Sequence, residues 1–164
     1  MCSRVHQGAT SADPTVLQNA AAVVMQARLL ADASALESQP MRGKKLALFS
    51  EALDDESHRE FIQAATALGA HVSLVMPGLH ECSTTAQINA VARLFSRLYD
   101  AVECQHLPVE LVRRLAESAD IPIFAGLATP EHATAELAHA LDSATPLPVR
   151  RRRVLQAVLL LSVN

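Results

Sequence analysis

Short apolar runs alternate along the chain with longer stretches in which apolar residues recur every three or four positions. The runs have the length of buried strands, and the longer stretches have the period of amphipathic helices. Strands are predicted over residues 45–49, 71–76, 101–104 and 121–124. Helices are predicted over residues 14–36, 57–68, 85–98, 109–118 and 130–141. This alternation predicts an α/β fold of three layers, a four-stranded parallel sheet with helices on both faces.

Composition divides the chain into four segments. Residues 1–13 are small and polar, and we expect a disordered leader there. Residues 14–143 carry the predicted strands and helices and form the α/β domain. Residues 144–148, with the sequence ATPLP, are interpreted as a linker. Residues 149–164 are predicted to form a C-terminal return helix that packs back on the domain.

Composition and charge exclude several classes of protein. Half of the 164 residues are apolar (50%) and only 3% are aromatic, so Ala, Leu and Val must build the core. The net charge of −3 lacks the general excess of positive charge that is typical of nucleic-acid-binding proteins. The apolar residues 154–163 are about half as many as the ~20 that cross a membrane. The three cysteines have no repeating spacing, which favours a reducing compartment. We predict a cytoplasmic protein with no membrane or nucleic-acid partner.

The stretch FSEALDDESHREF, residues 49–61, joins the first strand to its helix. In parallel α/β folds this loop commonly binds an anion, because free helix N–H groups point into it. Here it carries Asp54, Asp55 and Glu56 instead of positive charge. Acids in a first helical turn stabilise the helix by about 0.3–1 kcal/mol each. We therefore prefer helix capping to catalysis as the role of these acids.

Three stretches, taken in order, resemble the carbamoyl-phosphate-binding domain of aspartate and ornithine carbamoyltransferases. GKKLALFSEALDDESHREFIQAATALGAHVSLV is similar to that family's first strand, phosphate loop, helix and second strand. INAVARLFSRLYDAV resembles its next helix and third strand. ELVRRLAESADIPIFAGLATPEHATAELAHALD resembles its fourth helix, fourth strand and following helix. The resemblance implies the same α/β fold and a place in amino-acid metabolism.

The positions that bind carbamoyl phosphate in that family are largely replaced here. With Phe61 held in register, the family's Ser-Thr-Arg-Thr-Arg falls on Asp54, Asp55, Glu56, Ser57 and His58. Only Ser57 carries a hydroxyl group where the family also has one, and neither of the family's two arginines is present in this stretch. Each charged hydrogen bond to a phosphate is worth about 1.5–3 kcal/mol, so the resemblance implies a weakened phosphate loop.

Two further positions in the predicted crevice also depart from the family. The family's arginine after the third strand falls on Gln105. Its His-Pro-x-Gln motif after the fourth strand keeps the histidine as His132 and has Ala135 in place of glutamine. The resemblance also implies an amino-acid-binding second domain before the return helix, for which this sequence has no room. We therefore predict no catalytic residues and a missing second domain.

Cysteine and histidine side chains follow the predicted strands, where a metal could bind. Cys104, His106 and His132 are the candidate ligands, since thiolate and imidazole are the usual zinc ligands. Their spacing matches no recognised zinc motif. Loop histidines and a core cysteine are the simpler interpretation, and we predict neither a metal nor a cofactor.

The preferred functional hypothesis is a non-catalytic relative, or pseudoenzyme, with a structural or regulatory role. The resemblance implies a homo-oligomer, with a trimer favoured, and a protein partner is a further possibility. One alternative is a small-molecule or metal-binding protein that uses the altered crevice. Another is a residual carbamoyl-phosphate-binding carbamoyltransferase subunit. The four arginines 150–153 oppose the dipole of the helix they open, so we expect some of them to pair with carboxylates.

Overall fold

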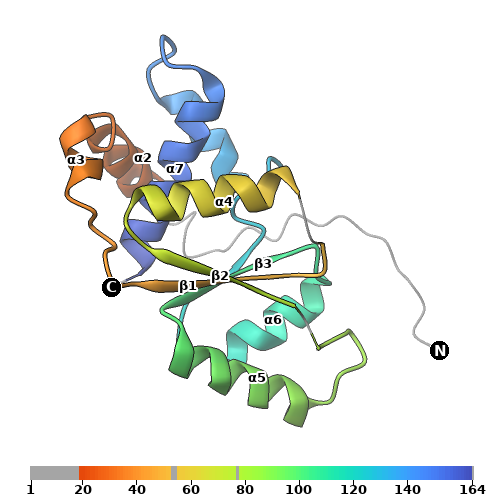
Figure 1. Ribbon diagram of the computed structural model, residues 1–164. Coiled ribbons are helices and arrows are strands. Elements are labelled where there is room, and N and C mark those ends of the chain that lie inside the picture. Colours follow the sequence, from red (N-terminus) through yellow and green to blue (C-terminus); the bar gives the residue numbers. More distant parts are fainter. Residues whose placement is uncertain (1–18, 53–54, 77, 164) are drawn as a thin grey trace.

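The computed structural model describes residues 19–52, 55–76 and 78–163 (Figure 1). The predicted leader and the first residues of the predicted 14–36 helix lie outside these ranges. In chain order the elements are α2 (Ala20–Leu29), α3 (Ala33–Glu37), β1 (Lys45–Ser50), α4 (Glu56–Ala67), β2 (His71–Val75), α5 (Thr85–Leu98), β3 (Ala101–Gln105), α6 (Val109–Ser118), β4 (Ile123–Ala125), the 3-10 helix η1 (Ala133–Ala140) and α7 (Leu147–Ser162).

The four strands form one parallel sheet in the order β2-β1-β3-β4. Leu46 of β1 lies opposite Val72 of β2 and Ala101 of β3, and Ser50 lies opposite Gln105. The strand order reverses at β1, since the chain goes from β1 to β2 on one side and returns to β3 on the other. The carboxyl ends of β1 and β3 therefore meet at the point where such sheets usually bind ligands.

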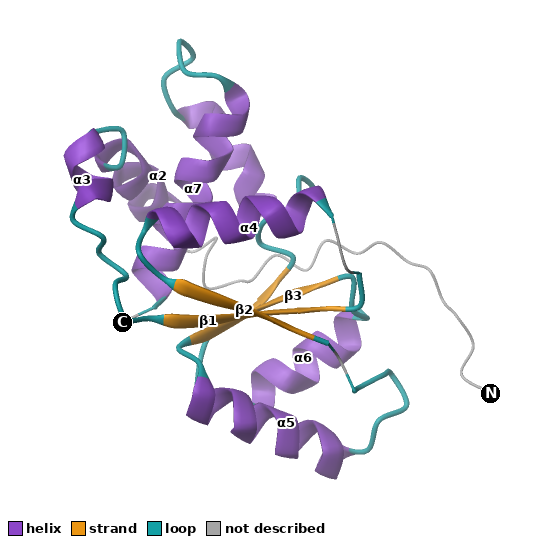
Figure 2. Cartoon of the chain, in the orientation of Figure 1, coloured by secondary structure: helices purple, strands orange, loops and turns teal. Residues whose placement is uncertain are grey.

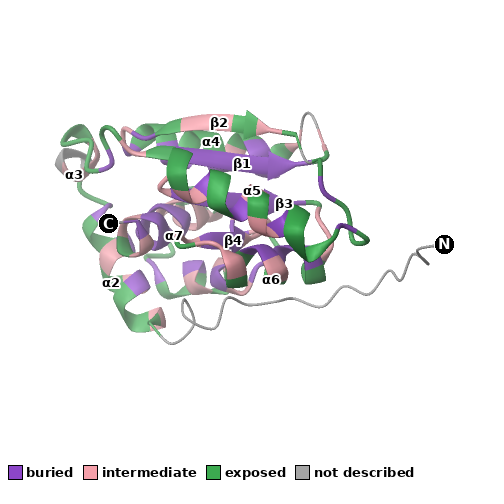
Figure 3. Ribbon diagram, turned by 90° about the horizontal axis from the view of Figure 1, so that it is seen from below, coloured by how far each residue is buried: buried purple, intermediate pink, exposed green. Residues whose placement is uncertain are grey.

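Helices cover both faces of the sheet, as predicted (Figures 1 and 2). Successive residues of β1 alternate between two cores. Leu46 and Leu48 belong to the core beneath α4 and α7, whereas Ala47 and Phe49 belong to the core above α5 and α6. Figure 3 shows β1 buried along its length and β2 partly exposed at the sheet edge. A central strand buried on both faces explains why its sequence is one continuous apolar run.

Helix α7 is the predicted return helix, and it packs against α4, α2 and η1. Val154 and Val158 contribute apolar side chains to that core. The buried Gln156 donates from Nε2 to the carbonyl oxygen of Ala64 in α4, at 3.2 Å. The helix begins at Leu147, so it takes in the last two residues of the segment predicted as a linker.

A second link between α7 and α4 involves the arginine run. Arg152 donates from Nε and Nη2 to the two carboxylate oxygens of Glu60, at 3.1 and 2.7 Å. A planar guanidinium fits a carboxylate in this two-bonded way. One of the four arginines thus pairs with a carboxylate of α4.

Two predicted helices differ in the structure. The 14–36 helix is interrupted after Leu29, because the N–H groups of Ala31 and Asp32 bond to carbonyls only three residues back. That tightened turn ends α2, and a separate α3 follows. The 130–141 helix is a 3-10 helix that starts at Ala133, after His132 caps it.

Strand β4 also begins later than predicted. Pro122 has no N–H and cannot donate to the ladder, although its carbonyl accepts from the N–H of Val102 at 3.0 Å. The strand therefore starts at Ile123 and not at Ile121.

Gly69 ends α4, as the sequence predicted, and its surroundings require glycine. Its φ is +91°, a region that other residues rarely adopt. A Cβ at this position would lie 2.8 Å from Cβ of Gln39 in the connector after α3. Gly43 has a similar φ of +88° but has nothing within 4 Å of an added Cβ.

Candidate functional site

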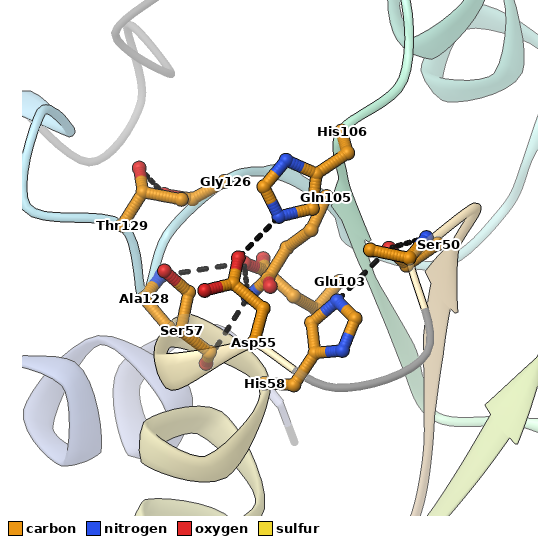
Figure 4. Close-up of polar contacts among 11 residues, drawn as sticks. Ser50, Asp55, Ser57, His58, Glu103, Gln105, His106, Gly126, Ala128 and Thr129 are labelled. Carbon is orange, nitrogen blue, oxygen red and sulfur yellow. Dashed lines mark hydrogen bonds and ion pairs between the residues drawn. The ribbon is translucent and has the colours of Figure 1, made fainter.

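The candidate site lies at the carboxyl ends of β1 and β3, where α4 begins (Figure 4). Side chains reach it from the end of β1, the first turn of α4, the end of β3 and the segment after β4. Predicted residues Asp55, Ser57, His58 and Gln105 come together here. Asp54 lies outside the described residues.

Asp55 occupies the N-cap position of α4, with the extended backbone typical of that position. Its carboxylate forms a short contact with Nε2 of His106, which follows β3. His106 reaches it from a backbone with φ of +57°, in the left-handed region. The hydrogen bond from His106 holds the pKa of Asp55 below its usual value. The N–H groups of Ser57 and Glu56 lower the pKa of Asp55 as well, so this carboxylate faces the N-terminus of α4 and remains charged beside the crevice.

His58 is buried one turn into α4, and its orientation is set from β1. Its Nε2 lies 2.9 Å from Oγ of Ser50, the last residue of that strand. The same Oγ accepts from the N–H of Ala52 at 3.2 Å, which leaves the hydroxyl proton available to the imidazole. The rings of His58 and His106 have centroids 5.8 Å apart at 64°. Two imidazoles and one carboxylate thus share the mouth of the crevice.

Glu103 and Gln105 project from β3 beneath the start of α4. Gln105 donates from Nε2 to Oε1 of Glu103 at 3.0 Å and to the carbonyl of Ser57 at 3.4 Å. The N–H of Ala128, after β4, also donates to Oε1 of Glu103 at 3.2 Å. Both side chains are buried, and burial raises the pKa of Glu103 to about 7. The N–H groups of Ala128 and Leu127 act to lower this pKa, but the effect of burial outweighs them.

The remaining predicted residues lie after β4. His132 is buried, and its Nδ1 accepts from the N–H of Thr134 at 3.2 Å, which caps η1. Ala135 lines a pocket of about 100 Å³ between α4, η1 and α7, together with Glu56 and Arg151. The structure therefore brings Ala135 and Glu56 to one pocket, while His132 holds a helix end.

The three metal candidates from the sequence do not meet. Cys104 points into the core above α5 and α6, on the other face of the sheet from Glu103 and Gln105. Burial raises the pKa of its thiol, so it has little tendency to form the thiolate that binds metal. His106 lies instead with Asp55 and His58, and these three are the group found near enough for one ion among the described residues.

Sequence reasoning missed Ser50 and Glu103. Ser50 is the last residue of an apolar strand, and nothing in the sequence besides this position indicates a role in the site. Glu103 did give one, because an acid inside a buried apolar strand is rare unless it is neutral or paired. Its raised pKa places it among the groups that mark functional or strained sites.

The fold is an α/β domain with one parallel sheet, and the described side chains gather at the carboxyl edge of that sheet. No protein-family model matches the chain. The chain is 34% identical over 105 residues to the ornithine carbamoyltransferase of Actinobacillus pleuropneumoniae, which is 64% of this chain and 31% of that protein. It is 31% identical over 105 residues to the catabolic enzyme of Pseudomonas putida, with the same shares covered.

Solved structures agree on the fold. The ornithine carbamoyltransferase of Burkholderia thailandensis superposes with a TM-score of 0.61 at 19% identity, over 75% of this chain and 43% of that one. The ornithine carbamoyltransferase of Pyrococcus furiosus superposes with a TM-score of 0.59 at 20% identity, over 75% of this chain and 40% of that one. The chain spans about a third (31%) of the length of the curated relatives it matches. It is a relative of the ornithine carbamoyltransferases, and what it shares with them is a single domain.

In the part of the chain that the structure describes, no helix has both the length and the apolar character needed to cross a lipid bilayer.

Proposed function

We propose that this chain is a non-catalytic relative of the ornithine carbamoyltransferases, with a structural or regulatory role in the cytoplasm. One observation carries the proposal. The carboxylate of Asp55 stands at the N-terminus of α4, which is where a parallel α/β sheet offers its N–H groups to a phosphate. The low pKa of Asp55 keeps that carboxylate charged at neutral pH.

Electrostatics opposes phosphate binding at this position. Two unit charges about 4 Å apart repel by about 4 kcal/mol at an effective dielectric constant of about 20. That is at most about a thousandfold loss of affinity for one ligand charge held at this distance, and solvent around the part-exposed Asp55 reduces it. Gln105, at the position where the resemblance implies an arginine, supplies no compensating charge and is already engaged with Glu103. Carbamoyl phosphate would therefore meet repulsion where the family supplies attraction.

Calorimetry with carbamoyl phosphate and with inorganic phosphate tests this proposal. We expect no saturable binding below the millimolar range. The variant Asp55→Thr restores a residue of the family's type, and together with Gln105→Arg it should bind phosphate measurably more tightly than the natural chain. Glu37→Gln removes an exposed carboxylate at the end of α3, on the side of the sheet where β1 begins, and serves as the control.

Micromolar binding of carbamoyl phosphate by the unaltered chain would overturn the proposal. So would carbamoyl transfer to ornithine, assayed with the chain alone and with a full-length carbamoyltransferase added. Either result would favour the alternative of a carbamoyltransferase subunit.

We further propose that the chain forms a homo-oligomer, with a trimer favoured by the family resemblance. Exposed apolar side chains on α5 support an interface, since Leu94 and Leu98 are each 51% exposed. Sedimentation equilibrium measures the mass directly. A monomer at all accessible concentrations would contradict this part of the proposal.

A further inference from the structure

We propose that Asp55, His58 and His106 form a binding site for a divalent transition metal of the zinc type. Each of the three offers one ligand atom, and these atoms lie within 4.8 Å of one another. Asp55 and His58 come from the start of α4, and His106 comes from the end of β3. The site requires no carbamoyl phosphate, but a divalent ion here would offset the negative charge of Asp55, so the phosphate-binding test of the proposed function is made on metal-free protein.

The separations are close to those of a bound ion. Ligands at about 2.0–2.2 Å from a tetrahedral zinc lie about 3.4 Å apart. No separation exceeds 4.8 Å, so the widest must close by up to about 1.4 Å, and the Asp55–His106 contact must open by about 1 Å. The side chains of His106 and Asp55 can make this movement, since they are 45% and 30% exposed. No rearrangement of the buried strands is needed.

Two features hold the imidazoles in place before any ion arrives. Ser50 Oγ lies 2.9 Å from Nε2 of the buried His58, a contact that limits the rotation of its ring. His106 adopts a φ of +57°, which brings its ring back over the crevice toward α4. Left-handed backbone at a residue other than glycine is uncommon and is concentrated at functional sites. Before any ion binds, His58 is thus held by Ser50 and His106 by Asp55.

The donor set predicts which ions bind. Two imidazole nitrogens and one carboxylate oxygen suit Zn²⁺, Co²⁺ and Ni²⁺, whereas Mg²⁺ and Ca²⁺ prefer oxygen ligands alone. Three protein ligands leave one position of a tetrahedral ion open to water or to a small ligand. An open position is typical of catalytic rather than structural zinc sites.

The test uses the full chain without a histidine tag and titrates it with ZnCl₂ by calorimetry. We expect one ion per chain with a dissociation constant in the micromolar range or tighter. Co²⁺ should give the visible absorption of a tetrahedral site containing nitrogen ligands. His106→Ala, at an exposed side chain, should weaken zinc binding by about 100-fold or more. Asp55→Asn should weaken it as well, and MgCl₂ should give no saturable binding.

His139→Ala is the matched control, because His139 is also exposed and also faces an acid, Glu136, at 3.8 Å. Its zinc affinity should equal that of the unaltered chain. Three outcomes would overturn the proposal: no saturable zinc binding below the millimolar range, unchanged affinity in His106→Ala, or an equal loss in both histidine variants. Circular dichroism of each variant confirms that a loss of affinity is not a loss of fold.

Discussion

The buried carboxyl of Glu103 makes the stability of this chain depend on pH in an unusual direction. Its side chain is fully buried, and its pKa is raised from 4.5 to about 7 in the folded chain. Between these two values the folded chain binds a proton that the unfolded chain has released. Stability therefore falls as pH rises through this window. From pH 5.5 to pH 8.5 this one group should lower the free energy of unfolding by about 2 kcal/mol.

The variant Glu103→Gln isolates this effect. A glutamine keeps Oε1 as an acceptor for Gln105 and for the N–H of Ala128, but it cannot ionise. Urea unfolding at pH 5.5 and pH 8.5 gives the free energy of unfolding of both proteins. The natural chain should lose about 2 kcal/mol more than the variant across this range. Histidines that titrate in the same window contribute equally to both proteins and cancel in the comparison.

Two results would refute this reasoning. An equal loss in Glu103→Gln would mean that Glu103 ionises as readily in the folded chain as in water. Removal of the pH dependence by Glu131→Gln, a change at an exposed acid, would assign it to general surface charge. Carbon-13 NMR of the Glu103 carboxyl gives an independent measurement, with an expected midpoint near pH 7.

Two further predictions concern elements that support the site. Gly69→Ala should lower the free energy of unfolding by about 2–4 kcal/mol, because it combines an unfavourable φ with a close contact. Gly43→Ala, with a similar φ and open space, should lower the free energy of unfolding by only about 1–2 kcal/mol. If urea unfolding gives equal losses for the two variants, the close contact with Gln39 does not contribute to the cost at Gly69. A double-mutant cycle of Arg152→Ala and Glu60→Ala should give a coupling of about 0.5–1 kcal/mol at low salt, since both side chains are about a third exposed. The coupling should shrink in 1 M salt, and its absence at low salt would mean that the pair does not form in solution.

The strands could be read from the sequence because parallel strands buried on both faces are continuous apolar runs. β1 and β3 appeared where predicted to within one residue at their ends. The helix break after Leu29 could not be read, because the apolar stripe continues through it and no proline or glycine marks it. The 3-10 form of η1 was equally hidden, since apolar spacing does not separate the two helix types at this length.

The place of the candidate site was predictable, but its contacts were not. Parallel topology alone puts the start of α4 beside the end of β3. The pairing of Asp55 with His106 joins residues 51 positions apart, and it depends on the positive φ of His106. Local spacing therefore pointed to Cys104 and His106 as neighbours, although alternation along β3 sends the cysteine to the opposite face. Long-range register decided which side chains meet.

The position of α7 sets an order of events for folding during synthesis. The layer of α5 and α6 uses residues that follow one another along the chain, so it can form soon after they leave the ribosome. The opposite layer needs Val154 and Val158 to close over α4. Until α7 is released, the part of this core that α7 covers stays open to water and to other nascent chains. A chaperone that binds exposed apolar helices would find its target in this interval.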